Sequence, residues 1–228
     1  MNATARSVGR EVIIGRNSKV WRAAAANPAV AARFRCAIGH ADVSGFAFEA
    51  DDRVWVFSYS RSPAENLALL SVLAAARVAE VVYVSTATAI VTRLTRCYEY
   101  PRVKQRAEDD ARRLLDARVL TLGIVVEREA QLPAGRHAAT LQGDLDAFLL
   151  APSWPLEQGR RKNLFEMLGA PMERGWEASL HRGYDAAQWL MRRWPCVLRP
   201  LDLLLRLAGV RWYGYVNLSD RLWNSTTS

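Results

Sequence analysis

Short runs of consecutive apolar residues recur along the first 130 residues of the chain. These runs predict buried strands, because a strand that is covered on both faces is apolar throughout. The expected strands are Glu11–Gly15, Phe34–Ile38, Val54–Phe57, Val81–Ser85 and Val119–Val125. A weaker strand is expected at Val43–Phe48.

Helical patterns fill the intervals between the runs. Ser18–Ala32 is rich in alanine, and Asn27-Pro28 is expected to end or kink this helix early. Ser62-Pro63 predicts the start of a second helix, which continues to Arg77, because serine caps a helix and proline suits its first position. A third helix is expected over Tyr100–Leu115, with Glu108 and Arg112 paired on its outer surface.

Strands that alternate with helices predict an α/β fold, a Rossmann-like doubly wound parallel sheet. The strand pattern stops near Leu132, and the rest of the chain is expected to form a small, mostly helical C-terminal region. Helices are expected there at 144–150, 162–168, 176–189 and 200–207. We therefore expect a sheet domain over residues 1–130 and a helical cap or interface region over residues 131–228.

Charge and cysteine content narrow the range of functions. The net charge is +8, but the arginines are spread along the chain and lysine occurs only at positions 19, 104 and 162. With no basic run and no nucleic-acid-binding motif, an anionic small molecule is a better expected partner than nucleic acid. Three scattered cysteines without a CxxC pair, and histidines without ligand spacing, predict a reduced cytoplasmic protein with no metal site. Neither a signal core nor a membrane-spanning stretch is evident in the sequence.

The sharpest motif is Tyr100-Pro-Arg-Val-Lys104, which begins fourteen residues after Thr86 at the end of a predicted strand. Tyrosine and lysine four residues apart lie on one face of a helix. The ammonium group favours the phenolate and lowers the pKa of the tyrosine, which can then act as a general acid or base. In these features the sequence resembles the short-chain dehydrogenase/reductase superfamily, and within it the extended branch of NAD-dependent epimerases and dehydratases.

The resemblance implies an enzyme that binds NAD or NADP in a dinucleotide-binding domain. Thr86, with Ser85 as second choice, Tyr100 and Lys104 would be its catalytic residues, and Lys104 would also hold the nicotinamide ribose. The reaction would be that of an oxidoreductase, epimerase or dehydratase. The substrate would be hydroxylated and anionic, such as a nucleotide sugar of polysaccharide biosynthesis. The resemblance also suggests a homodimer.

The turn after the first strand departs from this family, which carries three glycines there. Gly15 fits the first glycine, but Lys19 and Trp21 stand where the later ones belong. In one interpretation the amides at the helix start, with Ser18 and Lys19, still hold the phosphates. In the other, Trp21 fills the pyrophosphate groove and no dinucleotide binds. Under the first, the expected cofactor contacts here are Gly15, Arg16, Asn17, Ser18 and Lys19.

Further cofactor contacts are expected after the runs Phe34–Ile38 and Val54–Phe57. Asp42 would serve the adenosine ribose of NAD, whereas Arg16 with His40 would serve the phosphate of NADP; a plain polar turn is the third interpretation. Ser58, Tyr59 and Ser60 take the place of the small residues that the family has under the adenine and nicotinamide. Asn66 is expected on a helix surface, and His137 and His181 on the protein surface.

The C-terminal third is rich in tryptophan and arginine. Arg192–Ala208 is a basic apolar stretch, which predicts either a core or subunit-interface helix or peripheral contact with an anionic membrane. Two alternatives to an enzyme therefore stay open. One is a non-catalytic Rossmann-fold binding or regulatory protein that has lost the phosphate loop, and the other is a membrane-peripheral assembly protein.

Overall fold

The computed structural model describes residues 9–90, 95, 99–132, 137–154 and 160–169, with single residues at 193, 194, 196, 200, 203, 204 and 207. The chain forms two compact units that interleave along the sequence. Unit 1 comprises Met1–Ser85, Arg106–Leu120 and Gly143–Lys162, and unit 2 comprises Thr86–Gln105, Thr121–Gln142 and Asn163–Ser228. A division of the chain into domains near residue 130 stays a prediction.

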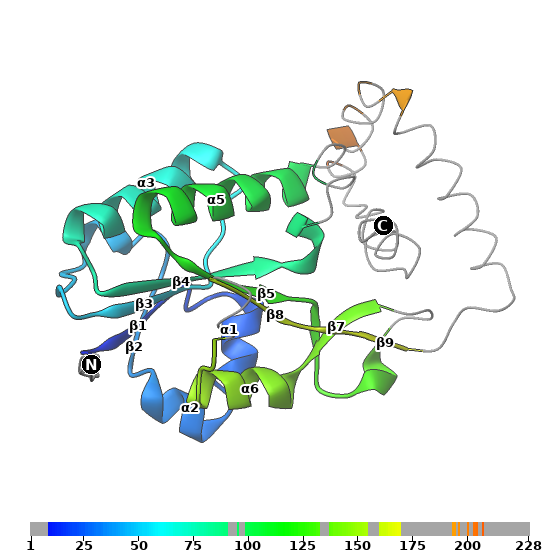
Figure 1. Ribbon diagram of the computed structural model, residues 1–228, viewed down its shortest axis with the longest axis horizontal. Helices are drawn as coiled ribbons and strands as arrows, with labels where there is room; N and C mark the ends of the chain where they lie inside the picture. The colour runs from blue at the N-terminus through cyan, green and yellow to red at the C-terminus, as the bar shows by residue number, and fades with distance from the viewer. Residues whose placement is uncertain are drawn as a thin grey trace, which may run out of the picture. The chain divides into compact units, whose positions relative to one another are not determined.

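A six-stranded sheet in the order β2-β1-β3-β4-β5-β8 dominates the fold (Figure 1). Its strands are β1 (Glu11–Ile14), β2 (Cys36–Ile38), β3 (Arg53–Val56), β4 (Glu80–Thr86), β5 (Arg118–Leu122) and β8 (Arg161–Leu164). Strand β1 pairs in parallel with β2 and β3, and β3 pairs in parallel with β4. The predicted Rossmann-like α/β class is thereby confirmed.

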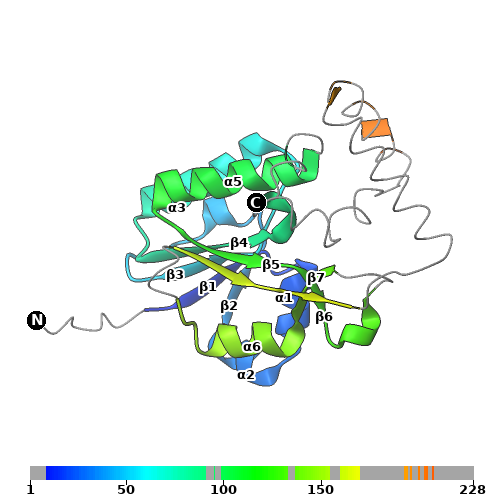
Figure 2. The ribbon, with the colours of Figure 1, turned by 45° about the vertical axis from the view of Figure 1, so that its right-hand side comes forward.

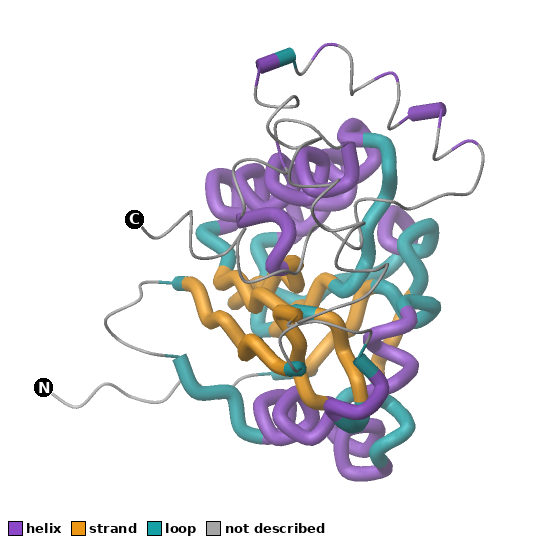
Figure 3. The backbone as a smooth tube through the Cα atoms, turned by 90° about the vertical axis from the view of Figure 1, so that its right-hand side faces the viewer, coloured by secondary structure: helices purple, strands orange, loops and turns teal. Residues whose placement is uncertain are grey.

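Helices cover both faces of this sheet. The helices are α1 (Lys19–Ala24), α2 (Pro28–Arg33), α3 (Pro63–Ala76), α5 (Glu99–Leu115) and α6 (Gln142–Leu150). Figures 1 and 2 show α3 and α5 over one face and α1, α2 and α6 over the other. In Figure 3 the strands, in orange, lie between these two helix layers. The alternation of apolar runs and helical patterns predicted this layering.

The strand core is apolar on both sides. Val12, Ile13 and Ile14 of β1 have no exposed surface, and each such side chain contributes roughly 1.5–3 kcal/mol when it leaves water. Between β3 and the helices, the Trp55 ring meets the rings of Phe34 and Phe148 edge to face, at centroid distances of 5.7 and 6.4 Å. Such edge contacts add to the burial energy.

The helix ends follow the predicted signals. Ser62 caps α3 by accepting a hydrogen bond from the Glu65 amide at 3.3 Å, and Pro63 holds the first helical position. Helix α1 ends at Ala24 with Ala25 as its C-cap, and Asn27 caps α2 by accepting from the Ala29 amide at 3.0 Å. The predicted break at Asn27-Pro28 is therefore confirmed.

The expected strand at Val43–Phe48 is wrong. Val43–Gly45 forms a 3₁₀ turn, η1. The sheet ends at β2, so the segment adds no strand to it. Phe46 and Phe48 instead contact each other, with ring centroids 4.8 Å apart, and pack against the core from outside the sheet.

The expectation that strands end near Leu132 is also wrong. Strands β6 (Ile124–Val126), β7 (His137–Leu141) and β9 (Glu166–Leu168) form a second sheet. Strand β7 runs parallel to β6 and antiparallel to β9. Gly123 lies between β5 and β6. No side chain fits at this position, because a Cβ there would lie 2.3 Å from the Ala138 carbonyl oxygen. His137, expected on the surface, is 2% exposed.

Of the four helices predicted in this part of the chain, the one at 144–150 is confirmed as α6. The one at 162–168 is wrong, since β8 and β9 occupy it. Its apolar residues fit a short strand as well as a helix, and pairing with existing strands decides the outcome. The helix at 176–189 and His181 lie outside the described residues, as do four of the eight residues in 200–207.

Candidate functional site

The strand order of the sheet reverses at β1, which lies between β2 and β3. In open parallel sheets, ligands bind outside the carboxyl ends of the strands at such a reversal. The three loops that follow β1, β2 and β3 begin at Gly15, Gly39 and Phe57, and all three belong to unit 1. Every cofactor contact predicted in unit 1 lies on one of these loops or on the first residue of α1.

The turn after β1 depends on glycine. Gly15 has φ +108°, and a Cβ there would lie 2.7 Å from the Ser58 amide nitrogen. The amides of Gly15 and Arg16 both donate to the Ile38 carbonyl, at 2.8 and 3.0 Å. One turn thus ties together the ends of β1, β2 and β3, and only a residue without a side chain fits so close to the neighbouring backbone.

Trp21 packs into the core of unit 1. Its ring centroid lies 5.6 Å from that of Phe34 and 5.6 Å from that of Phe57, and the residue is 4% exposed. Ser18 caps α1 and accepts from the Trp21 amide at 3.3 Å. The indole therefore fills the space between the helix and the strand. A glycine at this position would let the two elements pack more closely. Lys19, by contrast, is exposed.

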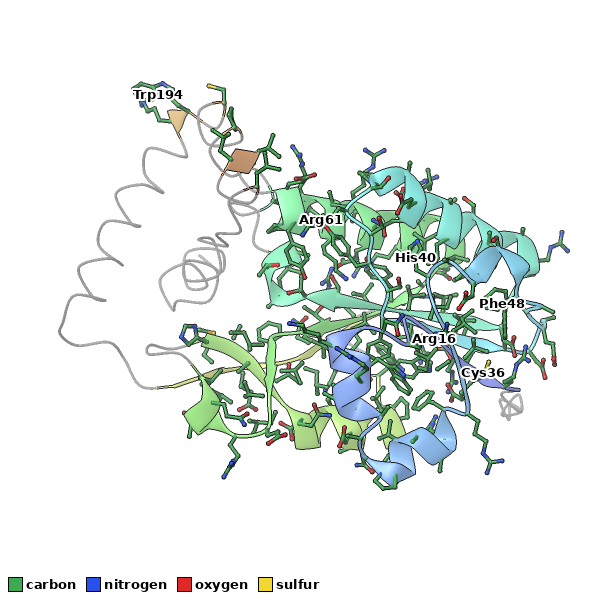
Figure 4. The ribbon with its side chains drawn as sticks, turned by 180° about the vertical axis from the view of Figure 1, so that it is seen from behind. Arg16, Cys36, His40, Phe48, Arg61 and Trp194 are labelled. Atoms are coloured by element: carbon green, nitrogen blue, oxygen red, sulfur yellow. The ribbon has the colours of Figure 1, made fainter. Side chains whose placement is uncertain are left out.

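The loop after β2 holds its polar groups in two contacts. The His40 Nδ1 lies 2.6 Å from the Ser58 hydroxyl, so it joins this loop to the one after β3. The Asp42 Oδ2 accepts from the Gly39 amide at 2.9 Å and lies 3.4 Å from the Arg16 guanidinium. Figure 4 labels Arg16 and His40 on their two loops.

The loop after β3 is fixed by a residue that sequence reasoning placed on a surface. Asn66 is 6% exposed, and its side-chain amide accepts from the Ser60 amide and donates to the Ser60 carbonyl, both at 2.8 Å. The Ser60 hydroxyl donates to Glu65 at 2.5 Å. One sequence signal could have indicated this role. An asparagine near the start of a helix lies within reach of the loop before it and can form hydrogen bonds with the backbone of that loop.

Cationic and small polar groups share this edge of the sheet. Arg16, Lys19 and Arg61 are exposed there, Ser58 is buried, and Tyr59 is partly buried. Exposed cations beside a tight glycine turn attract an anionic ligand. The chemistry of this edge therefore suits phosphate groups. Side-chain cations would bind them in part, whereas glycine-rich dinucleotide loops bind them mainly through backbone amides.

The predicted catalytic trio belongs to unit 2. Thr86 is the last residue of β4, and its hydroxyl accepts from the Thr88 amide at 3.5 Å and from the Thr88 hydroxyl at 3.4 Å. Tyr100 and Lys104 lie one turn apart at the start of α5. Lys104 is 7% exposed. Strand end and helix start thus carry the three residues as the sequence predicts, while the cofactor contacts of the first three loops lie in unit 1.

Ser85, which precedes Thr86, has a buried side chain. It is 4% exposed, and its hydroxyl has no hydrogen-bond partner among the described residues. A buried hydroxyl without a partner costs free energy, which a ligand oxygen or a water molecule recovers. Thr86, by contrast, is partly exposed.

Little of the basic apolar stretch at Arg192–Ala208 is described. Trp194, Leu203, Leu204 and Leu207 are 56%, 49%, 61% and 77% exposed. In the described part of the chain, no helix combines the length and the apolar character needed to cross a membrane.

Fold and loop geometry together define a Rossmann-like α/β protein, with polar loops gathered at the reversal of the strand order. No protein-family model matches the chain, and no curated protein matches it at a significant level.

Several solved structures are similar to this chain over most of its length. The crystal structure of gox2253 is similar over 83% of this chain and 84% of its own, with a TM-score of 0.52 and 13% identity. A nucleoside-diphosphate-sugar epimerase from Staphylococcus aureus aligns over 84% of this chain and 90% of its own, with a TM-score of 0.49 and 13% identity. A Citrobacter sp. triphenylmethane reductase complexed with NADP(H) aligns over 85% and 88%, with a TM-score of 0.49 and 9% identity. At such identities the likeness to gox2253 shows a common fold.

Proposed function

We propose that this chain is an NAD(P)-dependent oxidoreductase, epimerase or dehydratase that acts on a hydroxylated anionic substrate, with a nucleotide sugar as the first candidate. The observation that carries the proposal is the turn at Gly15. It closes against Ser58 at the reversal of the strand order, which is where open α/β sheets bind nucleotides. The net charge of +8 suits an anionic substrate and cofactor.

The residues at this edge fit a dinucleotide. The side chain most able to block the phosphates, Trp21, is buried against Phe34 and Phe57, while Lys19 and Arg16 are exposed. The segment Gly15–Lys19 would hold the pyrophosphate. The loop at His40 would hold the adenosine ribose, and Ser58, Tyr59 and Ser60 would line the path toward the nicotinamide. Bound NAD(P) would supply a carrier for two electrons and a proton as hydride.

The proton would be handled by the chain itself. Tyr100 would donate the phenol proton to a substrate carbonyl oxygen, or accept the proton of a substrate hydroxyl in the reverse direction. Lys104, one turn further along α5, would stabilise the phenolate and hold the nicotinamide ribose. Thr86 would orient the same substrate oxygen through its hydroxyl.

Isothermal titration with NAD, NADH, NADP and NADPH tests the cofactor site. We expect one oxidised and reduced pair to bind in the micromolar range, and Lys104→Ala to weaken that binding about tenfold, which is the size of one charge-assisted contact. Lys162→Ala removes a lysine from the edge strand β8 and should leave binding unchanged. If a well-folded sample binds none of the four, the proposal is wrong.

Tyr100→Phe separates chemistry from binding. With a panel of nucleoside diphosphate sugars and the preferred cofactor, the variant should lose at least about 100-fold in kcat, because a general acid–base residue contributes on that scale. The dinucleotide affinity measured by titration should stay within about twofold of the parent. Equal loss of both quantities would assign Tyr100 a structural role instead.

A non-catalytic Rossmann-fold binding protein is the second candidate. It is favoured by Lys19 and Trp21, which stand at positions that hold glycine in the dinucleotide loop. Under this alternative, no turnover appears with any substrate, whether or not the chain binds a dinucleotide. Tyr100→Phe would then leave the measured dinucleotide affinity unchanged. Turnover abolished by Tyr100→Phe would remove it.

A further inference from the structure

The described residues of the basic apolar stretch at Arg192–Ala208 all face solvent. The structure describes seven residues of this stretch, and each of them is exposed: Arg193, Trp194, Cys196, Pro200, Leu203, Leu204 and Leu207. Among all the described residues, five large apolar side chains are exposed, and four of these five lie here. The fifth is Leu150, at the end of α6. Exposed apolar surface is therefore concentrated in one short part of the chain, as at sites that contact a partner or a membrane.

Five of these exposed residues share one helical face. Positions 196, 200, 203, 204 and 207 are helical. At 3.6 residues per turn, their spacings of four, three, one and three residues place them within an arc of roughly 100°. An apolar arc of that width normally faces the core of a protein. Here it faces solvent, and the most exposed of its side chains, Leu207, has 77% of its surface accessible.

The same stretch carries an excess of positive charge. Four arginines and one acid, Asp202, give residues 192–208 a net charge of +3. Arg193 is exposed and directly precedes Trp194, which is labelled in Figure 4. Tryptophan favours the boundary between water and hydrocarbon, and arginine pairs with phosphate while its stem lies along apolar surface. Apolar and cationic groups in one segment match the chemistry of an anionic membrane surface.

A second copy of the chain suits this face less well than lipid does. In a two-fold dimer the same face meets itself, so the excess arginines of one protomer would oppose those of the other. Like charges that face each other oppose association. A bilayer with anionic phospholipids offers the opposite charge together with an apolar interior. Charge complementarity therefore favours lipid as the occupant.

We propose that the apolar face, formed by Trp194, Leu203, Leu204 and Leu207, binds the surface of a membrane that contains anionic phospholipids. The leucines enter the acyl chains just below the headgroups, and Trp194 lies at the level of the headgroups. Arg193 pairs with lipid phosphate. The contact holds the chain at the membrane surface and is independent of the proposed enzymatic function.

Co-sedimentation of the full chain with lipid vesicles tests the proposal. The vesicles contain either phosphatidylcholine alone or phosphatidylcholine with about one third phosphatidylglycerol, in about 0.1 M NaCl. The chain should bind the anionic vesicles in the micromolar range. It should bind the neutral vesicles at least about tenfold more weakly, because each arginine near an anionic surface contributes a factor of about five.

Paired variants separate the apolar face from exposure and charge in general. Leu204→Ala combined with Leu207→Ala should weaken binding to the anionic vesicles at least about tenfold, because it removes apolar surface that enters the bilayer. Leu150→Ala is the matched control: it removes an exposed leucine of α6 and should change binding by less than about twofold. Arg193→Ala should weaken binding about fivefold. Arg35→Ala, which removes an exposed guanidinium before β2, should have little effect.

Two further measurements show that the variants keep the rest of the molecule intact. The midpoint of thermal unfolding, followed by circular dichroism, should be unchanged, because the substituted side chains are exposed. The dinucleotide titration should also give the affinities of the parent chain. Loss of vesicle binding is then assigned to the substituted surface itself.

Three results would overturn the proposal. The folded chain could bind neither type of vesicle. The double leucine variant could bind anionic vesicles as well as the parent does, which would assign the binding to the net charge of +8 alone. Without lipid, the chain could form a dimer that the double leucine variant dissociates, which would assign the apolar face to a second copy. None of these results bears on the dinucleotide titration, so the proposed function is tested separately.

Discussion

At the scale of single residues, Gly15 combines a conformational constraint with a steric one. Its φ of +108° lies in a region that residues with side chains rarely adopt, and the Ser58 amide leaves no space for a Cβ. Its amide also donates to the Ile38 carbonyl. The position therefore serves both stability and the shape of the candidate cofactor edge.

Gly15→Ala should lower the free energy of unfolding by about 2–4 kcal/mol, because strain from the positive φ adds to the clash with backbone. Gly45→Ala is the matched control, since a Cβ at Gly45 meets nothing within 4 Å, and it should change stability by less than about 0.5 kcal/mol. Urea unfolding followed by circular dichroism measures both. Equal effects of the two substitutions would contradict this reading of the turn.

Cys36 provides a test of burial at the start of β2. Burial raises the pKa of the Cys36 thiol, and the nearby Arg10 opposes the shift to a smaller extent. Because only the thiolate reacts with iodoacetamide, alkylation at neutral pH should be slow and should accelerate only above the pH at which an ordinary thiol ionises.

Mass spectrometry of tryptic peptides follows this reaction at Cys36 across a pH series. Cys36→Ser should remove the slow modification. Fast alkylation of Cys36 at pH 7 in the folded protein would show that the thiol is neither buried nor protonated as described.

The sequence predicts single residues well where their role is local. The caps at Ser62 and Asn27 and the turn at Gly15 follow from residue chemistry within four positions. Asn66 was misplaced on a surface because its partner, the Ser60 backbone, is set by the path of a loop. The placement of the Trp21 ring likewise depends on Phe34 and Phe57, which no local pattern reveals. The roles of Thr86, Tyr100 and Lys104 stay predictions.

At the scale of elements, α3 ends on an unfavourable residue. Its C-cap, Arg77, is left-handed, with φ 53° and ψ 40°. Glycine is the usual residue at such a position because it has no Cβ. The helix therefore stores strain at its end that one substitution can remove.

Arg77→Gly should raise the free energy of unfolding by up to about 1 kcal/mol, the left-handed strain being larger than the extra backbone entropy of glycine. The same exchange at Arg106, an exposed position inside α5, should lower stability by about 1 kcal/mol. Chemical denaturation gives both values. A loss of stability at Arg77 would mean that its side chain contributes more than its backbone costs.

Elements with a strong local signal were predictable, whatever their length. Continuous apolar runs predicted β1, β3 and β4, and capping residues or helical periodicity predicted α3 and α5. The segments at Val43–Phe48 and Lys162–Leu168 mix polar and apolar residues, and their structure depends on which strand edge is available. That information belongs to the whole sheet.

At the scale of the whole molecule, one ion pair in unit 1 joins two segments that are far apart in the sequence. Arg161 of β8 donates to the Glu108 carboxylate of α5, 53 residues earlier, and Arg112 lies 3.7 Å from the same carboxylate. Glu108 was expected on the outer surface of its helix, but it is 3% exposed. Burial lowers the pKa of the Arg161 guanidinium, while Glu108 raises it.

Arg161→Met should lower the free energy of unfolding by about 3 kcal/mol, because it leaves a buried carboxylate without its main partner. Arg161→Met combined with Glu108→Met should recover most of the loss. Arg160→Met is the matched control: Arg160 pairs with Asp116, and both side chains are more than half exposed, so little change is expected. A double variant as unstable as the single one would show that the two residues act separately.

The sheet order also has a consequence for the order in which the chain is synthesised. Strand β5 has β4 on one side and β8 on the other, and β8 begins at Arg161, whereas β5 ends at Leu122. A ribosome that adds about 5–20 residues per second takes roughly 2–8 s to cover the 38 residues between these two strands. During that interval the nascent chain presents an open, apolar strand edge, which is the feature that neighbouring chains and chaperones recognise.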